Sequence, residues 1–179
     1  MKKNIAYFLS LTLLFSLAAG VLFSCKKNEP LSPAPATEEK AEAGYKAPDF
    51  QAALLSGESF KLSEQTGKTI VLNFWATWCG YCVKEMPYFE ELSAEYGEEV
   101  RFIGINVGES QKKVEEFINQ KGFTFDIVLD PDETVSRKYP TDAIPLTVIV
   151  KPDGTVAKTV LGARAKDEWK EIIDSAMKN

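Results

Sequence analysis

The sequence predicts an α/β domain in which a mixed β-sheet is flanked by helices on both faces. Strand patterns and helix patterns alternate through residues 47–179, which is typical of this class. Residues 69–75 (TIVLNFW) are almost all apolar or β-prone, as expected for a buried central strand. The last two strand patterns are joined by a Pro152-Asp153-Gly154 turn, which predicts a terminal hairpin.

The first half of this domain is expected to begin with an extra hairpin around the turn Ser56-Gly57-Glu58. Pro87 lies inside the long helix of this half, where we expect it to cause a kink. The predicted elements are strands at 47–55 and 59–62, a short turn or helical piece at 63–67, the central strand at 69–75, and a helix at 80–96.

The second half continues the alternation and ends in an amphipathic helix. That last helix places Trp169, Ile172, Ile173 and Met177 on one stripe, which predicts that this face packs on the sheet. The predicted elements are strands at 100–107, 125–129, 146–151 and 155–160, helices at 111–121 and 166–178, and a short helix at 133–139.

Composition limits the chemistry that the chain can perform. Among its 179 residues are three Cys and no His, and the formal net charge is -5. The lack of His excludes a Ser-His-Asp or Cys-His nucleophile and any His-bearing zinc, haem or blue-copper site. Three Cys are one short of an all-thiolate zinc site, so we expect no metal centre. The negative charge argues against nucleic acid as a partner.

The N-terminus has the pattern of a secretory signal. Lys2-Lys3 precedes an uncharged apolar run over residues 5–23, which small Ser24 follows. Leu22-Phe23-Ser24-Cys25 resembles the lipobox of bacterial lipoproteins, and this resemblance implies that Cys25 is acylated and becomes the mature N-terminus. The apolar run is also long enough to cross a bilayer, so an uncleaved anchor helix is the alternative. Either way the domain is expected to be extracytoplasmic and tethered to a bacterial membrane, facing the periplasm or the cell surface.

Residues 28–46 are rich in Pro and Glu and poor in large apolar side chains. Such a composition does not form a core and predicts an extended, solvated linker. We therefore divide the chain into a lipoprotein signal peptide (1–24), a lipidated Cys with a flexible linker (25–46), and one folded domain (47–179).

Two cysteines, Cys79 and Cys82, lie in the sequence WCGYC, where the central strand gives way to a helix. Unpaired N–H groups and the helix dipole at a helix N-terminus favour an anion, so the pKa of the Cys79 thiol is expected to be lowered. A spacing of three brings both sulfurs within bonding range. We expect Cys79 to form a mixed disulfide with a substrate and Cys82 to resolve it.

With these residues the chain resembles the thioredoxin superfamily, and within it the membrane-anchored thiol-disulfide oxidoreductases of the TlpA/ResA type. The resemblance lies in the segments VLNFWATWCGYC (71–82), APDF (47–50), NVGE (106–109) and Ile144-Pro145. It implies a thioredoxin fold with an extra N-terminal hairpin and a central insertion. It also implies an enzyme that exchanges dithiol for disulfide with protein clients, in many relatives the thiols of apocytochrome c before haem attachment.

The resemblance carries further expectations about direction and partners. A reductase would need electrons from a membrane thiol-relay protein of the DsbD/CcdA kind, and we expect a monomer without a cofactor. The Gly80-Tyr81 pair differs from the Gly-Pro of thioredoxins and is similar to that of periplasmic disulfide isomerases. An isomerase or oxidase therefore stays open as an alternative.

Further residues complete the expected site. The resemblance implies a cis bond between Ile144 and Pro145, with Pro145 facing the dithiol and the Ile144 backbone pairing with substrate. Trp78 is expected at the rim, shielding the sulfurs and contacting substrate, whereas Trp75 is expected in the core.

Glu85 lies three residues after Cys82, on a mostly apolar helical stripe. There it is either an exposed helix residue or a carboxyl of raised pKa that moves a proton to and from Cys82. The resemblance favours the proton relay. Asn73 stands where thioredoxins hold a buried Asp, and because Asn cannot ionise, Glu85 is the expected substitute.

Two other functions fit part of the pattern. Thiol peroxidases of the peroxiredoxin type share the Ala-Pro-Asp-Phe start and the fold, but their reactive Cys lacks the WCxxC setting. A non-enzymatic Cu(I) carrier would use two thiolates, but carriers of the Sco type add a His that this chain lacks. Peroxide consumption and metal titration distinguish these from disulfide exchange.

Overall fold

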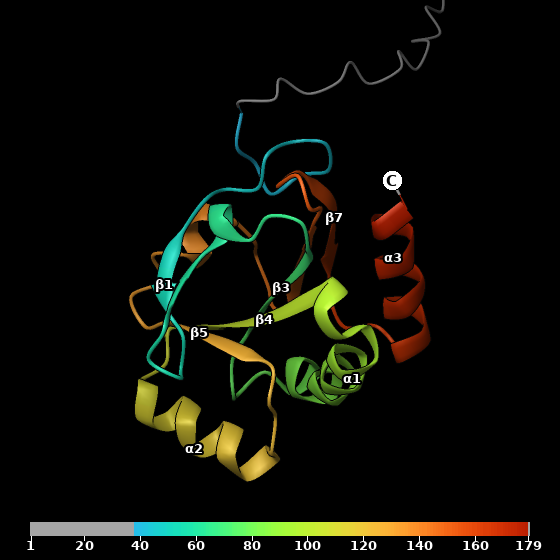
Figure 1. Cartoon of the computed structure of the whole chain (residues 1–179). Helices are drawn as coiled ribbons and strands as arrows, with labels where there is room; N and C mark the ends of the chain where they lie inside the picture. Colours follow the sequence, from blue (N-terminus) through green and yellow to red (C-terminus); the bar gives the residue numbers. More distant parts are fainter. Residues whose placement is uncertain (1–37, 179) are drawn as a thin grey trace, which may run out of the picture. The chain divides into compact units, whose positions relative to one another are not determined.

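The computed structural model describes residues 38–178, so the signal peptide, Cys25 and most of the linker lie outside the described part. No helix within residues 38–178 is long and apolar enough to cross a membrane. The sheet strands are β3 (Thr69–Trp75), β4 (Val100–Val107), β5 (Asp126–Asp130), β6 (Leu146–Val150) and β7 (Val156–Leu161). They form one mixed sheet in the order β5-β4-β3-β6-β7 (Figure 1).

The central strand β3 has β4 parallel on one side and β6 antiparallel on the other. Each of its seven residues is buried, as the apolar pattern predicts. Successive side chains point to opposite faces, so Val71 and Trp75 join one core cluster while Leu72 and Phe74 join the other. The strand that leads to the two cysteines is therefore fixed from both sides.

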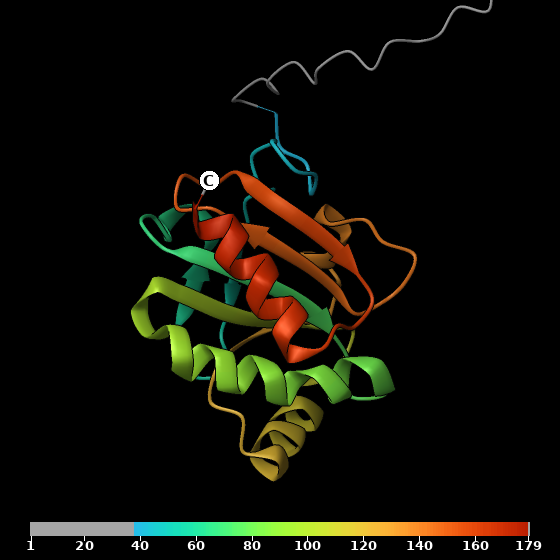
Figure 2. The same ribbon diagram turned by 90° about the vertical axis from the view of Figure 1, so that its right-hand side faces the viewer.

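Three α-helices, α1 (Gly80–Tyr96), α2 (Gln111–Lys121) and α3 (Lys166–Lys178), contribute to the cluster that contains Trp75. Figure 2 shows α1 and α3 lying across the same face of the sheet. All three have the predicted bounds, and α1 continues through Pro87 as one helix. The predicted α/β class with a mixed sheet and helical flanks is confirmed.

The opposite face is covered differently from the prediction. Its cluster contains Phe50 and Phe60 from the N-terminal hairpin, and Val135 and Tyr139 from the β5–β6 connection. The short helix expected at residues 133–139 is reduced to a single 3-10 turn, Ser136–Lys138. Glu133 has a φ of 58°, a left-handed conformation that an α-helix does not contain. The cover on this face is therefore mostly hairpin and loop.

The extra hairpin is confirmed as a separate two-stranded sheet, β1 (Gln51–Ala53) with β2 (Ser59–Lys61). Both strands are shorter than predicted. Just after β1, Leu54 forms a bridge with Val128 of β5, and the Leu55 N–H donates to the Ile127 carbonyl at 2.7 Å. The hairpin therefore lies against the β5 edge of the main sheet.

The end of the expected linker is in contact with the sheet at its other edge. The Gly44 N–H donates to the Val156 carbonyl at 2.9 Å, and the Val156 N–H donates to the Tyr45 carbonyl at 2.8 Å. Lys46 also forms a bridge with Thr155. Hydrogen-bonded structure thus begins before Ala47, the residue at which the composition predicts the domain to start.

Candidate active site

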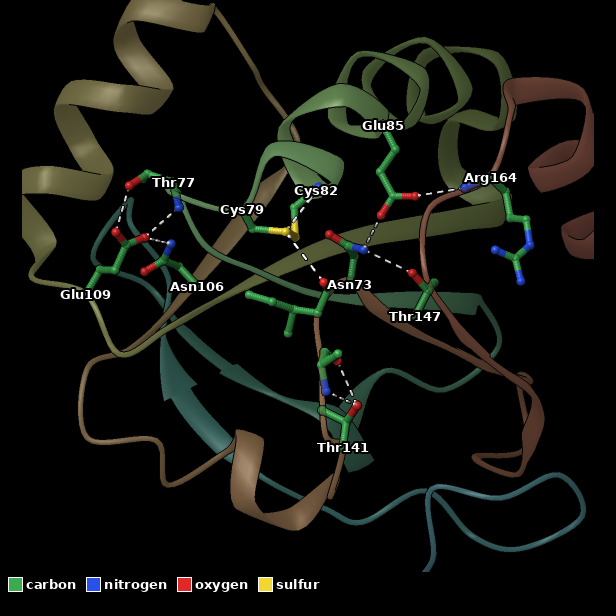
Figure 3. Close-up of a disulfide and its surroundings, with 12 residues drawn as sticks. Asn73, Thr77, Cys79, Cys82, Glu85, Asn106, Glu109, Thr141, Thr147 and Arg164 are labelled. Carbon is green, nitrogen blue, oxygen red and sulfur yellow. Dashed lines mark hydrogen bonds between the residues drawn. A yellow bond between two sulfur atoms is a disulfide. The ribbon is translucent and has the colours of Figure 1, made fainter.

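Cys79 and Cys82 form a disulfide at the N-terminus of α1, with a Cα–Cα distance of 5.3 Å (Figure 3). Cys79 is the N-cap residue of the helix, and its sulfur accepts a hydrogen bond from the Cys82 N–H at 3.2 Å. Cys79 is 7% exposed and Cys82 is completely buried. When the pair is reduced, this N–H and the helix dipole favour a thiolate at Cys79 by roughly 0.3–1 kcal/mol.

The segment before β6 faces this disulfide. The Ile144–Pro145 peptide bond is cis, as the resemblance implies. The Ile144 carbonyl oxygen lies 3.6 Å from the Cys79 sulfur. The structure therefore brings the WCGYC segment and the Ile144-Pro145 segment together, although they are far apart in the sequence.

Glu85 lies one helical turn after Cys82 and is completely buried. The Asn73 amide donates to its Oε1 at 3.1 Å, while the Arg164 backbone N–H and the Trp169 indole donate to its Oε2 at 3.3 and 3.2 Å. Figure 3 shows the carboxylate pointing toward Asn73 and Arg164. The exposed alternative for Glu85 is therefore excluded.

Burial raises the pKa of Glu85 to about 7, even though hydrogen bonds from Trp169, Arg164 and Asn73 lower it. The cause is desolvation, since a charged carboxylate is disfavoured away from water. A carboxyl with a pKa near neutral pH both accepts and donates a proton readily. Glu85 thus presents a carboxyl of near-neutral pKa one helical turn after Cys82.

Asn73 connects the carboxyl to the sheet. Its amide nitrogen donates to Glu85 and also to the Thr147 hydroxyl on β6, at 3.0 Å (Figure 3). The side chain is 3% exposed. An amide at this position holds Glu85 without adding a second buried charge, which would compete with it for the proton.

The surface around the disulfide is apolar. Trp78, Tyr81 and Leu161 are the exposed large hydrophobic residues among those described, with 69%, 73% and 52% exposure. Two of them belong to the WCGYC segment, and Leu161 pairs with Leu146, the residue after Pro145. Trp78 is thus at the rim as predicted, whereas Trp75 is completely buried and packs on Phe117.

A groove with a volume of about 670 Å³ adjoins this surface. It shares Trp78 and Ile144 with the surroundings of the disulfide. Its other lining residues are apolar (Phe74, Val107, Pro140, Ala143) and polar or charged (Glu133, Ser136, Arg137, Thr141, Asp142). Its size is in the range of sites that hold a small molecule or several side chains.

Sequence reasoning missed several residues of this site. Arg164 and Trp169 reach Glu85 from the β7–α3 connection and α3, and Thr147 on β6 accepts a hydrogen bond from Asn73. Trp169 stands on an apolar helical stripe, so only its core role was visible. Glu109 lies in the NVGE segment, but no pattern in the sequence indicates that its carboxylate binds Thr77, two residues before Cys79. These contacts are set by the tertiary fold.

Comparisons with known proteins agree with this geometry. The sequence model of the AhpC/TSA family matches residues 43–159. The chain is 38% identical over 141 residues to the thiol-disulfide oxidoreductase ResA of Geobacillus thermodenitrificans, covering 78% of this chain and 81% of that protein.

Two solved structures are similar throughout the folded region. A putative thiol:disulfide interchange protein DsbE from Chlorobium tepidum has a TM-score of 0.71 and 28% identity, covering 75% of this chain and 97% of that one. A putative protein disulfide isomerase from Bacteroides thetaiotaomicron has a TM-score of 0.69 and 29% identity, covering 80% and 92%. The chain belongs to the AhpC/TSA family of the thioredoxin superfamily and, within it, to the ResA-type thiol-disulfide oxidoreductases.

Proposed function

We propose that this thiol-disulfide oxidoreductase works outside the cytoplasm as a membrane-tethered monomer that reduces disulfides in protein clients, apocytochrome c among them. The signal-like residues 1–24 and the lipobox-like setting of Cys25 support the location. The observation that carries the reaction is the Cys79–Cys82 disulfide beside a buried carboxyl, Glu85, whose pKa is about 7.

In the proposed reaction the reduced enzyme starts with Cys79 as a thiolate. Its sulfur attacks one sulfur of a client disulfide, the client S–S bond breaks, and the other client sulfur leaves as a thiolate that takes up a proton. Cys82 then loses its proton and attacks the Cys79 sulfur. The client's remaining thiolate leaves, and the Cys79–Cys82 disulfide forms. Two electrons have passed to the client, and a membrane thiol-relay protein of the DsbD/CcdA kind restores the dithiol.

Glu85 is the proposed proton relay for the second step. Cys82 is completely buried, so water does not remove its proton directly. Glu85 is equally buried on the same side of α1 and about half ionised near pH 7. It accepts the Cys82 proton when the mixed disulfide is resolved and returns a proton when the disulfide is reduced again.

Clients are proposed to bind as extended segments over the apolar surface at the disulfide. Trp78 and Ile144 line the same groove, and the Ile144 carbonyl lies 3.6 Å from the Cys79 sulfur, close enough for the backbone of Ile144 to pair with a chain bound there. The exposed Trp78 ring offers contact area at low cost in side-chain entropy.

Trapping of the mixed disulfide tests this assignment. The Cys82→Ser variant should accumulate a covalent complex with the client through Cys79, because the resolving thiol is missing. The Cys79→Ser variant is the matched control and should form no such complex and no product. If Cys79→Ser retains exchange activity, the assignment of Cys79 as the attacking thiol is wrong. A mixed disulfide of the wild type that joins the client to Cys82 would contradict it equally.

Disulfide isomerisation is a second candidate, supported by the likeness to the putative isomerase and by the Gly80-Tyr81 pair. The reduction potential of the dithiol separates the two functions. A value near that of thioredoxin, about −270 mV, supports a reductase. A value near that of protein disulfide isomerase, about −180 mV, supports an isomerase.

A further inference from the structure

A second buried carboxylate, Glu109, lies in the connection between β4 and α2. Its Oε2 accepts hydrogen bonds from the Thr77 backbone N–H at 2.7 Å and from the Asn106 amide at 2.8 Å. Its Oε1 accepts from the Thr77 hydroxyl at 2.7 Å and pairs with the Lys113 ammonium at 2.6 Å. Figure 3 shows Glu109, Asn106 and Thr77 grouped on the Cys79 side of the disulfide.

Thr77 belongs to the short connection 76–79 between β3 and the first turn of α1. Within it, the Cys79 N–H donates to the Ala76 carbonyl at 3.1 Å. In the part of the chain that the structure describes, Glu109 is the one side chain from elsewhere that is hydrogen-bonded to residues 76–78. The position of this connection, and with it the start of α1, therefore depends on Glu109.

Glu109 is a fixed charge, in contrast to Glu85. Burial raises its pKa, but hydrogen bonds from Lys113, Thr77 and Asn106 outweigh burial and hold the pKa at about 2. The carboxylate is thus ionised at every pH at which the protein works. An ionised acceptor makes charge-assisted hydrogen bonds, which are shorter and stronger than neutral ones. Glu109 is suited to hold a loop rather than to move a proton.

We propose that Glu109 is a positioning residue for disulfide exchange. By holding both donors of Thr77, it keeps the Cys79 sulfur at the N-terminus of α1 and facing Ile144, where its thiolate is stabilised. Through Lys113 and Asn106 the same carboxylate ties this alignment to α2 and β4. The β4–α2 connection therefore influences how reactive Cys79 is. This inference rests on the proposed role of Cys79 as the attacking thiol.

The chain contains a matched control for this test. Glu90, in the middle of α1, binds Thr124 in the same two-point manner, with the backbone N–H at 2.7 Å and the hydroxyl at 2.5 Å. Glu90 lies eleven residues after Cys79, or roughly 16 Å along the helix at about 1.5 Å per residue. Replacing Glu90 removes an equivalent loop contact without touching the dithiol.

The experiment compares Glu109→Ala and Glu90→Ala with the wild type, each as the reduced full-length chain in detergent. The pH dependence of iodoacetamide alkylation gives the pKa of the reactive thiol, and peptide mass mapping shows which Cys reacts. Removing the negative charge of Glu109 should by itself lower the pKa of Cys79. Loss of positioning should raise it, so the two effects have opposite signs.

We expect Glu109→Ala to raise the pKa of Cys79 by about 0.5 units or more, and thus to slow alkylation at least threefold at pH 7 because less thiolate is present. Glu90→Ala should leave the pH profile unchanged. An unchanged or lowered pKa in Glu109→Ala would overturn the proposal, and so would equal rises in both variants, which would indicate general destabilisation.

Thr77→Val provides a second variant if Glu109→Ala does not fold, since it removes one donor and keeps the charge. Thr124→Val is its control. A raised Cys79 pKa in Thr77→Val alone supports the proposal, and no difference between the two variants refutes it. Alkylation at Cys82 in the wild type would instead show that the proposed function assigns the attacking thiol wrongly, which is a separate failure.

Discussion

The substitution Glu85→Gln gives a direct test of the buried carboxyl because it removes the ionisation and keeps the shape. The pKa of Glu85 is about 7 in the folded protein, against an ordinary value of 4.5. Between these values the folded state binds more protons than the unfolded state, so the wild type loses stability as pH rises. At about 1.4 kcal/mol per pKa unit, a shift of about 2.5 units gives a full loss of about 3.5 kcal/mol, of which about 3 kcal/mol is reached at pH 7.

Glu85→Gln lacks this loss, because Gln does not ionise. Its stability relative to the wild type should therefore be constant below pH 4.5 and rise by about 3 kcal/mol as pH increases to 7. The constant part depends on how well the Gln amide replaces the hydrogen bonds from Asn73, Arg164 and Trp169, but the pH-dependent part does not.

The measurement is urea unfolding of the oxidised full-length protein in detergent, from pH 2.5 to pH 8. In the oxidised state Cys79 and Cys82 do not titrate, so they do not contribute to the difference. Glu109→Gln serves as a control of opposite sign. Since the pKa of Glu109 is lowered to about 2, its contribution to stability is present above pH 4.5 and is lost as pH falls toward 2. A stability difference between Glu85→Gln and the wild type that does not change with pH would refute the raised pKa.

Three further predictions concern single contacts and chemistry. Trp169→Phe removes the indole donor to Glu85, so the pKa of Glu85 should rise further. NMR titration of the Glu85 carboxyl carbon measures this change, and a fall in the pKa would contradict the role given to the hydrogen bond. Tyr139→Phe removes the hydrogen bond from the buried Tyr139 hydroxyl to the Pro48 carbonyl at 2.6 Å. In urea unfolding it should lower the free energy of unfolding by about 1–3 kcal/mol with an unchanged denaturant slope. A neutral effect would show that water replaces this bond. The reduced protein should consume hydrogen peroxide no faster than an ordinary thiol of similar pKa in stopped flow, and rapid turnover would instead favour the peroxidase alternative.

Local patterns predicted the elements that lead to the site. The residues of β3 are apolar or β-prone except Asn73, and α1 combines an N-cap Cys79 with an apolar stripe, so the predicted bounds of both elements agree with the structure. The 133–139 segment shows the limit of such patterns. Its composition permits a helix, but the Asp130 carboxylate accepts hydrogen bonds from the Val135 and Ser136 N–H groups and organises a turn instead.

Residue spacing and the family resemblance predicted the part of the candidate site that lies on α1. Cys79, Cys82 and Glu85 are three residues apart along one helix, so their neighbourhood follows from helix geometry. Several partners of the two buried carboxylates are distant in sequence: Thr77 is 32 residues from Glu109, and Trp169 is 84 residues from Glu85. No periodicity in the sequence reports such contacts. The opposite pKa shifts of Glu85 and Glu109 depend on these partners, since the two residues are chemically identical.

The placement of the N-terminal segment has a consequence for aggregation. An open sheet presents unpaired N–H and C=O groups along its two outer strands, and these are templates for pairing with another chain. Here residues 44–46 occupy one end of the β7 edge, and Leu54-Leu55 occupy part of the β5 edge. A single stretch ahead of β3 therefore protects both borders of the sheet, and its removal would expose both borders at once.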